Sequence, residues 1–367
     1  MKTKAAILYG PRTSLVIDEI DLEGPKEKEV LVKFMAAGLC HTDLSIINGV
    51  FSPAPFPLIL GHEGAGIIQE IGAGITRVKA GDHVVMTLMP VCGQCYFCLR
   101  QQHHLCADRD KVRGGTMFDG TCRSKKGNQN IYVFSGLGCF SEYNVVNEQS
   151  IIPIDPSLPF DRVALLGCSV VTGVGAVINK AKVKPGSSVA VVGVGGVGLN
   201  VIQGAVLANA ARIIAIDRID SKLEYAKKFG ATNVINSSKE DPVKKVMELT
   251  SGIGIDYAFE AIGGMETALT TYKLIRKGGT AVIIGVAGPE ANIAISLFEL
   301  PVMDKNVLGS FMGSGDIRID LLNLINLYKI GRLKLDELIT KRYKLEEINT
   351  GFKDMEAGKN ARGVILF

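Results

Sequence analysis

The sequence predicts an α/β protein of two domains, one antiparallel and partly barrel-like, the other a doubly wound parallel sheet. The chain has 367 residues, which exceeds the about 250–300 residues beyond which chains usually split into domains. Residues 1–170 show short strand patterns punctuated by Gly and Pro, which are typical of antiparallel sheets. Residues 171–311 alternate strand patterns with helical ones, as in a parallel sheet covered by helices. We therefore expect a change of architecture near residue 170.

The individual elements follow from periodicity and from turn residues. In the first domain we expect strands over residues 30–36, 64–71 and 83–87. In the second domain, six apolar runs lie at residues 188–192, 212–216, 233–236, 256–260, 280–286 and 306–309. The last segment contains an amphipathic stretch at 321–330, a further segment at 344–355 and a final strand at 363–367. Six strands with intervening helices predict the doubly wound sheet.

Composition and charge restrict the class of protein. The chain is 47% hydrophobic and 21% charged, with 42 glycines, as expected of a globular α/β enzyme. The net charge of +4 is small and the basic residues are scattered, so no nucleic-acid partner is expected. The N-terminus alternates apolar and polar residues and no apolar run reaches about 18 residues, which argues against a signal peptide and a membrane span. We expect a cytoplasmic protein whose eight cysteines are reduced and available to metals.

A glycine-rich turn within residues 187–217 is typical of a dinucleotide site. Gly193, Gly195 and Gly198 match the pattern GxGxxG between an apolar strand and an apolar helix. The first glycine allows a tight turn, the second lets the backbone approach a pyrophosphate, and the third lets the helix pack closely on its strand. Gly196 and Val197 complete the turn, where N–H groups at the start of the helix would face the phosphates. The alternative, a plain connection from strand to helix, is weakened by an acid at the end of the next strand.

Asp217 is that acid, and it lies 19 residues after Gly198. A carboxylate there can accept hydrogen bonds from both ribose hydroxyls and would repel a 2′-phosphate, so we predict NAD as the cofactor. Arg218 is also assigned to the cofactor site. Because a guanidinium could instead favour a phosphate, NADP remains the alternative.

A loop of four cysteines has the spacing of a structural zinc site. The loop CGQCYFCLRQQHHLC contains Cys92, Cys95, Cys98 and Cys106. Four thiolates close a tetrahedron around Zn²⁺ and leave no open position. Four unrelated thiols or a redox dithiol are the alternatives. His103 and His104 lie in the same loop, and we expect both to be exposed.

Three residues that lie far apart in the sequence have the chemistry of a catalytic zinc site, namely Cys40, His62 and Cys168. Each lies at the end of a regular element, next to glycine. Two thiolates and one neutral imidazole leave a fourth position open for water or substrate. Glu63 could act as an outer or transient ligand, and Asp43 could orient the imidazole. Taken alone, each of the three is more often a buried core cysteine or a hydrogen-bonded histidine than a metal ligand.

Together these motifs resemble those of the zinc-dependent medium-chain alcohol dehydrogenases, in particular class III-like or aryl (benzyl) alcohol dehydrogenase-like members. The resemblance runs nearly from end to end, through GLCHTD at 38–43, GHEGAG at 61–66, the cysteine loop, LLGCSVVTG at 165–173, GVGGVG at 193–198 and GKNARGVILF at 358–367. It implies a GroES-like catalytic domain, residues 1–170 and 312–367, interrupted by a Rossmann NAD-binding domain, residues 171–311. It also implies two Zn²⁺ per chain and a homodimer or homotetramer.

The resemblance also implies roles for single residues. Cys40, His62 and Cys168 would bind the catalytic zinc, and the cysteine loop would bind the structural zinc. Thr42 and Glu63 match catalytic positions, and Ser45 replaces a histidine that completes the proton relay in many relatives. The positions that match cofactor contacts are His41 and Arg362 at the pyrophosphate, Thr172 near the nicotinamide, Asp217 and Lys222 at the adenosine ribose, and Val286.

The substrate pocket implied by the resemblance is apolar and includes Thr42, Phe51, Leu88 and Phe140. This lining favours a primary alcohol, aromatic or medium-chain, that is oxidised reversibly to its aldehyde. The alternative is a glutathione-dependent formaldehyde dehydrogenase, in which Arg109 and Arg113 would bind a substrate carboxylate. Residues 50–57 carry no charge, unlike the acidic loop of those enzymes. A non-catalytic zinc module that binds nucleic acid and a zinc-free reductase on the same fold are the remaining alternatives.

Overall fold

The chain divides into two compact units. The structure, a computed structural model, describes residues 1–367. Unit 1 consists of Met1–Cys168, Asp316–Ile325 and Leu335–Phe367, and unit 2 consists of Ser169–Gly315 and Asn326–Lys334. The predicted boundaries were residues 170 and 311, with all of 312–367 in the first domain. The observed division differs mainly because helix α10 (Ile317–Lys329) begins in unit 1 and ends in unit 2.

Unit 1 contains a closed barrel of five short strands, in the order β1-β2-β7-β8-β4. The strands are β1 (Lys2–Leu8), β2 (Val16–Leu22), β4 (Leu58–Ile59), β7 (Ser124–Lys126) and β8 (Gln129–Val133). Side chains alternate along such strands, so Ala5, Ile7 and Ile20 are buried together with Ile59 and Ile131 in one apolar cluster. Strand β4 leads directly into the GHEGAG turn, and the packed barrel therefore determines where that turn begins.

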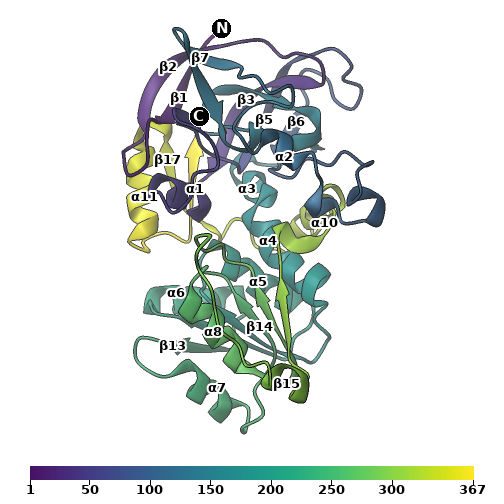
Figure 1. Cartoon of the computed structure of the whole chain (residues 1–367), viewed down its shortest axis with the longest axis vertical. Helices are drawn as coiled ribbons and strands as arrows, with labels where there is room; N and C mark the ends of the chain where they lie inside the picture. The colour runs from purple at the N-terminus through teal and green to yellow at the C-terminus, as the bar shows by residue number, and fades with distance from the viewer. The chain divides into compact units, whose positions relative to one another are not determined.

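The second sheet of unit 1 has seven strands, in the order β10-β6-β5-β3-β18-β17, with β9 also paired to β3. The strands are β3 (Glu29–Gly38), β5 (Gly64–Ile71), β6 (His83–Met86), β9 (Tyr143–Asn147), β10 (Ile151–Ile154), β17 (Ile339–Lys344) and β18 (Arg362–Leu366). Strand β18 pairs antiparallel with β3, so that Val364 lies opposite Gly38. The C-terminal segment thus lies within the N-terminal unit, as the yellow and purple ribbons of Figure 1 show.

Short helices connect the strands of unit 1. They are α1 (His41–Ile47), α2 (Arg109–Val112), α3 (Phe160–Val163) and α11 (Ile348–Glu356). Helix α1 follows β3 after only Leu39 and Cys40, and its apolar residues Leu44 and Ile46 are buried. Cys40 therefore occupies a short, well-anchored connection between a strand and a helix.

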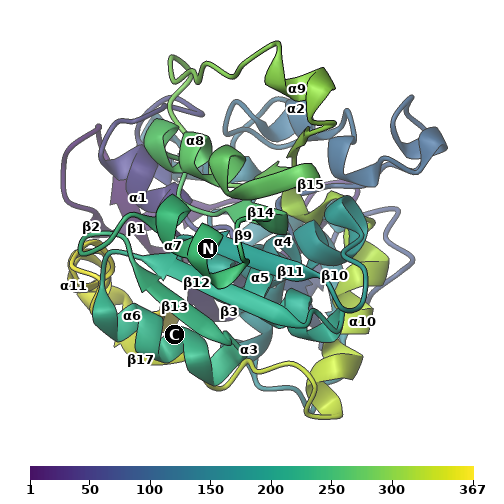
Figure 2. The same ribbon diagram turned by 90° about the horizontal axis from the view of Figure 1, so that it is seen from below.

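Unit 2 is a six-stranded sheet in the order β13-β12-β11-β14-β15-β16, and every neighbouring pair is parallel. The strands are β11 (Ser188–Val192), β12 (Arg212–Asp217), β13 (Asn233–Asn236), β14 (Ile255–Glu260), β15 (Ile275–Ile283) and β16 (Asn306–Gly309). Figure 2 shows β13, β12, β11, β14 and β15 following one another. This is the strand order of the Rossmann fold, and the predicted fold class is confirmed.

Helices cover both faces of this sheet. They are α4 (Ser169–Gly175), α5 (Gly196–Leu207), α6 (Asp220–Phe229), α7 (Pro242–Leu249), α8 (Met265–Leu274) and α9 (Glu299–Val302). Helix α5 packs against α6, and α7 packs against α8, as right-handed crossovers to the two sides of β11 require. The start of α7 shows local sequence control, because the Asp241 carboxylate accepts hydrogen bonds from the N–H groups of Val243 and Lys244.

One predicted strand is displaced. The apolar run at 280–286 predicted a strand to residue 286, but β15 begins at Ile275 and ends at Ile283. Beyond Ile283, the N–H groups of Ile284 and Gly285 donate to the carbonyl of Glu260 on the neighbouring strand. Strand β15 ends at Ile283 because its two partners end there, β14 at Glu260 and β16 at Gly309, and hydrophobicity alone does not reveal where the partners end.

No single helix is both long and apolar enough to cross a membrane; only a bent pair, Phe160–Gly167 with Ser169–Ala181, meets that test when counted together.

Candidate functional site

Residues from three distant segments meet in one buried cluster of unit 1. Potential ligand atoms of Cys40, His62, Glu63 and Cys168 all lie within 4.8 Å of one another, and all four residues are buried. Strand β3 leads to Cys40, the turn after β4 carries His62 and Glu63, and Cys168 ends the segment that follows α3. The fold therefore brings together the three residues predicted to bind the catalytic zinc.

The imidazole of His62 is oriented for metal binding. Its Nδ1 lies 3.2 Å from Oδ1 of Asp43, and both side chains are fully buried. The same carboxylate oxygen accepts a hydrogen bond from the N–H of Gly61 at 3.1 Å. The other ring nitrogen, Nε2, has no hydrogen-bond partner. A carboxylate on one nitrogen and a free lone pair on the other is the usual arrangement of a metal-binding histidine, so the predicted contact with Asp43 is present.

The thiols of Cys40 and Cys168 lie next to each other. The hydrogen bond from Cys168 holds the pKa of Cys40 well below its usual value, and the same bond raises the pKa of Cys168. Burial works against ionisation of either thiol. Bound Zn²⁺ would replace the thiol protons, since metal binding deprotonates cysteine ligands. The donor set therefore fits a zinc ion held by Cys40, His62 and Cys168.

Two glycines leave the space that this cluster needs. A Cβ on Gly38 would lie 2.4 Å from Oε2 of Glu63, and a Cβ on Gly167 would lie 2.1 Å from the carbonyl oxygen of Met86. Both distances are far below van der Waals contact. Gly38 therefore admits the Glu63 carboxylate, and Gly167 lets the segment before Cys168 approach strand β6.

Arg362 is part of the same cluster. Its Nη2 donates to Oε2 of Glu63, and the two side chains are 5% and 0% exposed. Burial raises the pKa of Glu63 to about 8, against the opposing effect of the Arg362 charge. The resemblance assigned Arg362 to the pyrophosphate of the cofactor, and that contact stays a prediction. What the sequence did not reveal is its pairing with Glu63, because 299 residues separate the two.

Replacing Asp43 with Asn is expected to weaken zinc binding or activity about 10–100-fold. The amide keeps the shape of the carboxylate but loses the charge that orients and polarises the His62 ring. Zinc retention during titration with a chelator and kcat with a primary alcohol measure the effect. Asp82→Asn, which removes an exposed partner of Lys79, is the control. Unchanged zinc retention and kcat in Asp43→Asn would contradict the assigned role.

The cysteine loop forms a second cluster in unit 1. The sulfur atoms of Cys92, Cys95, Cys98 and Cys106 lie within 4.8 Å of one another. The N–H groups of Cys92, Cys95 and Ala107 point at the sulfurs of Cys106, Cys92 and Cys95, at 3.3, 3.3 and 3.5 Å. The hydrogen bond from Ala107 is the main reason why the pKa of Cys95 is lowered to about 6. Donors that favour thiolates and four converging sulfurs fit a structural Zn²⁺.

The prediction that His103 and His104 are exposed was wrong, because both are half-buried. Nδ1 of His103 lies 3.2 Å from Oδ2 of Asp316, directly before helix α10. The Asp316 carboxylate also accepts from Nε and Nη2 of Arg318, at 2.9 and 2.6 Å. The cysteine loop is thus attached to the first turn of α10, which accounts for the place of that turn in unit 1.

The glycine turn of unit 2 has the geometry of a nucleotide-binding turn. Gly193 has a φ of +90°, which side chains rarely allow. A Cβ on Gly198 would lie 1.9 Å from the carbonyl oxygen of Gly193, whereas a Cβ on Gly195 would meet no atom within 4 Å. Gly196 and Val197 are half-buried at the start of α5. As predicted, Gly193 therefore makes the tight turn, Gly195 leaves the backbone open, and Gly198 allows the close packing.

Asp217 ends strand β12 beside this turn. Its Oδ2 accepts from the N–H of Val194 at 3.0 Å, and its Oδ1 accepts from the N–H groups of Arg218 and Ile219 at 2.7 and 3.1 Å. The carboxylate is half-buried, and its acceptor capacity extends beyond these three bonds. Besides its predicted contact with ribose, Asp217 therefore holds the glycine turn in shape, a function that sequence spacing did not indicate.

The remaining residues predicted for catalysis and for the cofactor occupy varied environments. On helix α1, Thr42 and Ser45 are half-buried and His41 is exposed. In unit 2, Arg218 and Val286 are exposed, Lys222 is half-buried, and Thr172 is buried with its hydroxyl 3.6 Å from the sulfur of Met312.

The predicted pocket residues also differ in exposure. Phe51 is half-buried and Leu88 is buried. Phe140 is fully buried, and its ring lies 5.9 Å from that of Phe352, so it packs in the core of unit 1.

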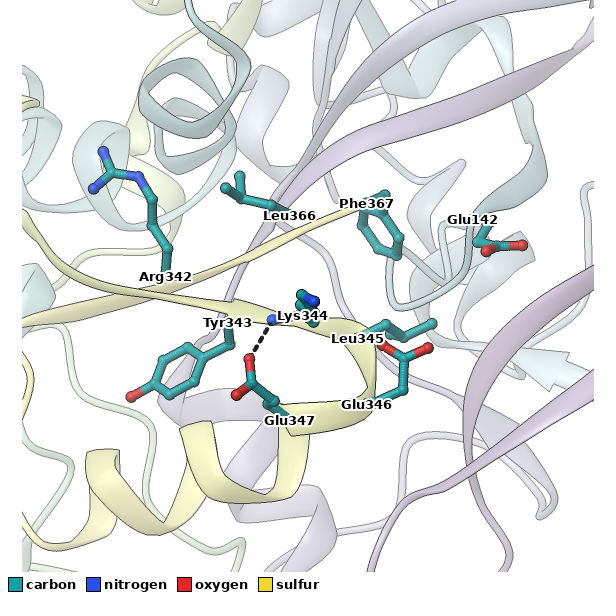
Figure 3. Close-up of a pocket in the computed structure, with 9 residues that line it drawn as sticks. All are labelled: Glu142, Arg342, Tyr343, Lys344, Leu345, Glu346, Glu347, Leu366 and Phe367. Carbon is teal, nitrogen blue, oxygen red and sulfur yellow. Dashed lines mark hydrogen bonds between the residues drawn. The ribbon is translucent and has the colours of Figure 1, made fainter.

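A hollow on the surface of unit 1 lies apart from these residues (Figure 3). Its lining includes the charged side chains of Arg342, Glu346 and Glu347. Arg342 pairs with Asp161, Glu346 lies near the ammonium group of a lysine on β1, and Glu347 accepts from the N–H of Lys344. Each of these charged groups therefore already has a partner within the chain. None of the predicted site residues lines the hollow.

Comparisons with known proteins agree with this geometry. Residues 26–156 match the family described as alcohol dehydrogenase GroES-like domain, and residues 196–327 match the family described as zinc-binding dehydrogenase. Two relatives match along 100% of this chain: an NDMA-dependent alcohol dehydrogenase from Amycolatopsis methanolica, 41% identical over 99% of its length, and an S-(hydroxymethyl)glutathione dehydrogenase from Synechocystis sp., 42% identical over 100% of its length.

A similar crystal structure is that of benzyl alcohol dehydrogenase from Acinetobacter calcoaceticus, with a TM-score of 0.93 and 31% identity over 100% of this chain and 99% of that one. The chain belongs to the zinc-binding alcohol dehydrogenase family.

Proposed function

We propose that this protein is a zinc-dependent alcohol dehydrogenase that transfers a hydride between a primary alcohol with an aromatic or medium-chain body and NAD, giving the aldehyde. The main support is the buried cluster of Cys40, His62 and Cys168, in which Nε2 of His62 has no partner. Three ligands of this kind leave one coordination position for a substrate. The reduced cysteines suit the cytoplasm, where we expect the enzyme to act.

The two units would supply different parts of the reaction. Zinc in a three-ligand site supplies a Lewis acid that polarises an alcohol or carbonyl oxygen. Asp43 holds the His62 ring through Nδ1 and leaves Nε2 free to bind the zinc. The hydroxyl of Thr42 would accept the alcohol proton. Because the Ser45 hydroxyl has no pKa near neutrality, the last step of proton release would go directly to water. In unit 2, the glycine turn and Asp217 would bind NAD, and Asp217 favours NAD over NADP.

The alternative substrate is the adduct of formaldehyde and glutathione. The sequence identity of 42% to S-(hydroxymethyl)glutathione dehydrogenase supports this alternative. Arg109 on helix α2 and Arg113 directly after that helix also support it, and burial lowers the pKa of Arg109. Against it, residues 50–57 carry no charge. The similarity to benzyl alcohol dehydrogenase instead supports an apolar alcohol.

NADH formation by the zinc-loaded protein separates the two substrates. Activity with benzyl alcohol and NAD, without glutathione, is the expected result. Activity only with formaldehyde plus glutathione, lost in Arg109→Met/Arg113→Met, would replace the proposed substrate with the alternative. Absence of NADH formation with any primary alcohol, in protein that holds two zinc ions, would contradict the proposed function.

Replacing Ser45 with His is expected to raise kcat modestly, because an added proton-transfer group speeds turnover only as far as proton release limits it. The imidazole would accept a proton that the Ser45 hydroxyl cannot hold near neutrality. The pH profile of kcat measures the change, which should appear where the new imidazole is neutral, above its usual pKa of about 6.5, and should fade below it. Ser52→His, in the following loop, is the control. An unchanged profile would show that proton transfer does not limit turnover.

We also propose that two copies associate through unit 2. Strand β16 forms one edge of the sheet, and Leu297 and Phe298, 84% and 72% exposed, lie shortly before it. A free edge with nearby apolar side chains favours pairing with another chain. Leu297→Asp/Phe298→Asp is expected to halve the mass measured by light scattering. Ile253→Asp, at an exposed residue away from that edge, is the control. An unchanged mass in the double variant would contradict this interface.

A further inference from the structure

The strand order of unit 2 determines which strands face each half of a bound dinucleotide. In such sheets, ligands bind beyond the carboxyl ends of the strands where the order reverses, here between β11 and β14. The glycine turn after β11 would hold the pyrophosphate, and Asp217 at the end of β12 would hold the adenosine ribose. The nicotinamide half must then extend in the opposite direction, over the ends of β14 and β15. Only Val286 among the residues there has a predicted role.

Glu260 is the last residue of β14 and lies beside Val192, the last residue of β11. Its side chain is 0% exposed. Oε1 accepts from the N–H groups of Ile262 and Gly263 at 3.0 and 2.9 Å and from the hydroxyl of Thr267 at 2.7 Å. Oε2 accepts from the N–H of Gly263 at 3.1 Å. The carboxylate therefore holds the turn between β14 and α8 and connects it to the first part of that helix.

This turn is packed tightly against both of its neighbours. Gly263 has a φ of +89°, and a Cβ there would lie 2.7 Å from the carbonyl oxygen of Val286. A Cβ on Gly285 would lie 2.0 Å from the nitrogen of Gly263 and 2.6 Å from Oε2 of Glu260. On the other side, a Cβ on Gly193 would lie 2.3 Å from Cγ1 of Ile262. The Glu260 carboxylate thus sits behind a surface formed by Ile262 and by the chain around Val286.

We propose that Glu260 is a positioning residue for the nicotinamide half of the cofactor. The Glu260 carboxylate positions this half by keeping the backbone of Ile262 and Gly263 against the chain at Gly285 and Val286. This inference rests on the proposed NAD-dependent function. Because the carboxylate occupies the N–H groups of the turn, a change of its hydrogen-bonding character would shift that surface. The adenosine site at Asp217 lies on the other side of β11 and would be unaffected.

The test compares binding of NAD with binding of ADP-ribose, which lacks the nicotinamide ring. In Glu260→Gln, the amide group would direct N–H donors at the N–H groups of the turn, so at least one hydrogen bond is lost. Calorimetric titration of the zinc-loaded protein is expected to show NAD binding weakened about tenfold, as one such bond implies, with ADP-ribose affinity unchanged. The control Glu266→Gln changes an exposed carboxylate on helix α8 and is expected to leave both affinities unchanged.

Thr267→Val provides a milder variant that removes one hydrogen bond and should weaken NAD binding in the same direction. Equal losses of NAD and ADP-ribose affinity, or no loss of either, would overturn the positioning role. These results can be separated from a failure of the proposed function, in which the wild-type protein would itself bind neither NAD nor ADP-ribose.

Discussion

Replacing Cys168 with Ser is expected to lower the zinc content from two ions to one per chain. It should also reduce kcat/KM with a primary alcohol by more than about 10–100-fold, which is the loss expected when only a hydrogen-bond partner of a metal ligand is removed. The serine hydroxyl is a poor zinc ligand, and it cannot replace the thiolate that Cys168 would become on binding zinc. Elemental analysis gives the zinc content, and steady-state kinetics gives the activity.

Cys122→Ser is the matched control for this change. Cys122 is also buried, at 7% exposed, but it belongs to neither cysteine cluster. The control variant is expected to keep two zinc ions and its activity. If Cys168→Ser kept both zinc ions and nearly full activity, the cluster of Cys40, His62 and Cys168 would not be the catalytic centre.

Above about pH 8, where Glu63 is ionised beside Arg362, replacing Arg362 with Leu is expected to destabilise the protein by about 3–5 kcal/mol, because it leaves that carboxylate buried without its cation. For a domain of this size, about 2–4 °C of melting temperature corresponds to each kcal/mol, so the midpoint should fall by roughly 6–20 °C. Thermal unfolding of the zinc-loaded protein, with the zinc content measured in parallel, tests this expectation.

Two further variants show whether the charge is responsible. Glu63→Gln/Arg362→Leu removes both charges and is expected to recover most of the lost stability, which a double-mutant cycle measures. Lys341→Leu breaks the ion pair that the exposed Lys341 of β17 forms with Asp354 of helix α11 and should cost only about 0–1 kcal/mol. If the double variant were as unstable as Arg362→Leu, packing of the guanidinium rather than its charge would explain the effect.

The parts of the site that the sequence predicted well are those built from neighbouring residues. The cysteine loop and the glycine turn each lie within about 15 residues, so spacing alone limits how their atoms can be arranged. The elements of the Rossmann sheet followed from apolar runs, since hydrophobic burial favours the same pattern in the sequence and in the core. The end of β15 was predicted wrongly because it depends on where the neighbouring strands β14 and β16 end, opposite Ile283.

Patterns within single segments predicted the class of fold, the cysteine loop and the glycine turn, because the interactions that shape these segments are local. The tertiary structure alone decided that Cys40, His62 and Cys168 converge, since the packing of β3, the turn after β4 and the segment after α3 sets those distances. It alone decided that Arg362 faces Glu63, through the pairing of β18 with β3. It also decided that Glu260 folds a turn beside the glycine motif, because parallel pairing places the end of β14 next to the end of β11. Contacts between distant segments depend on strand register, and no pattern within one segment encodes it.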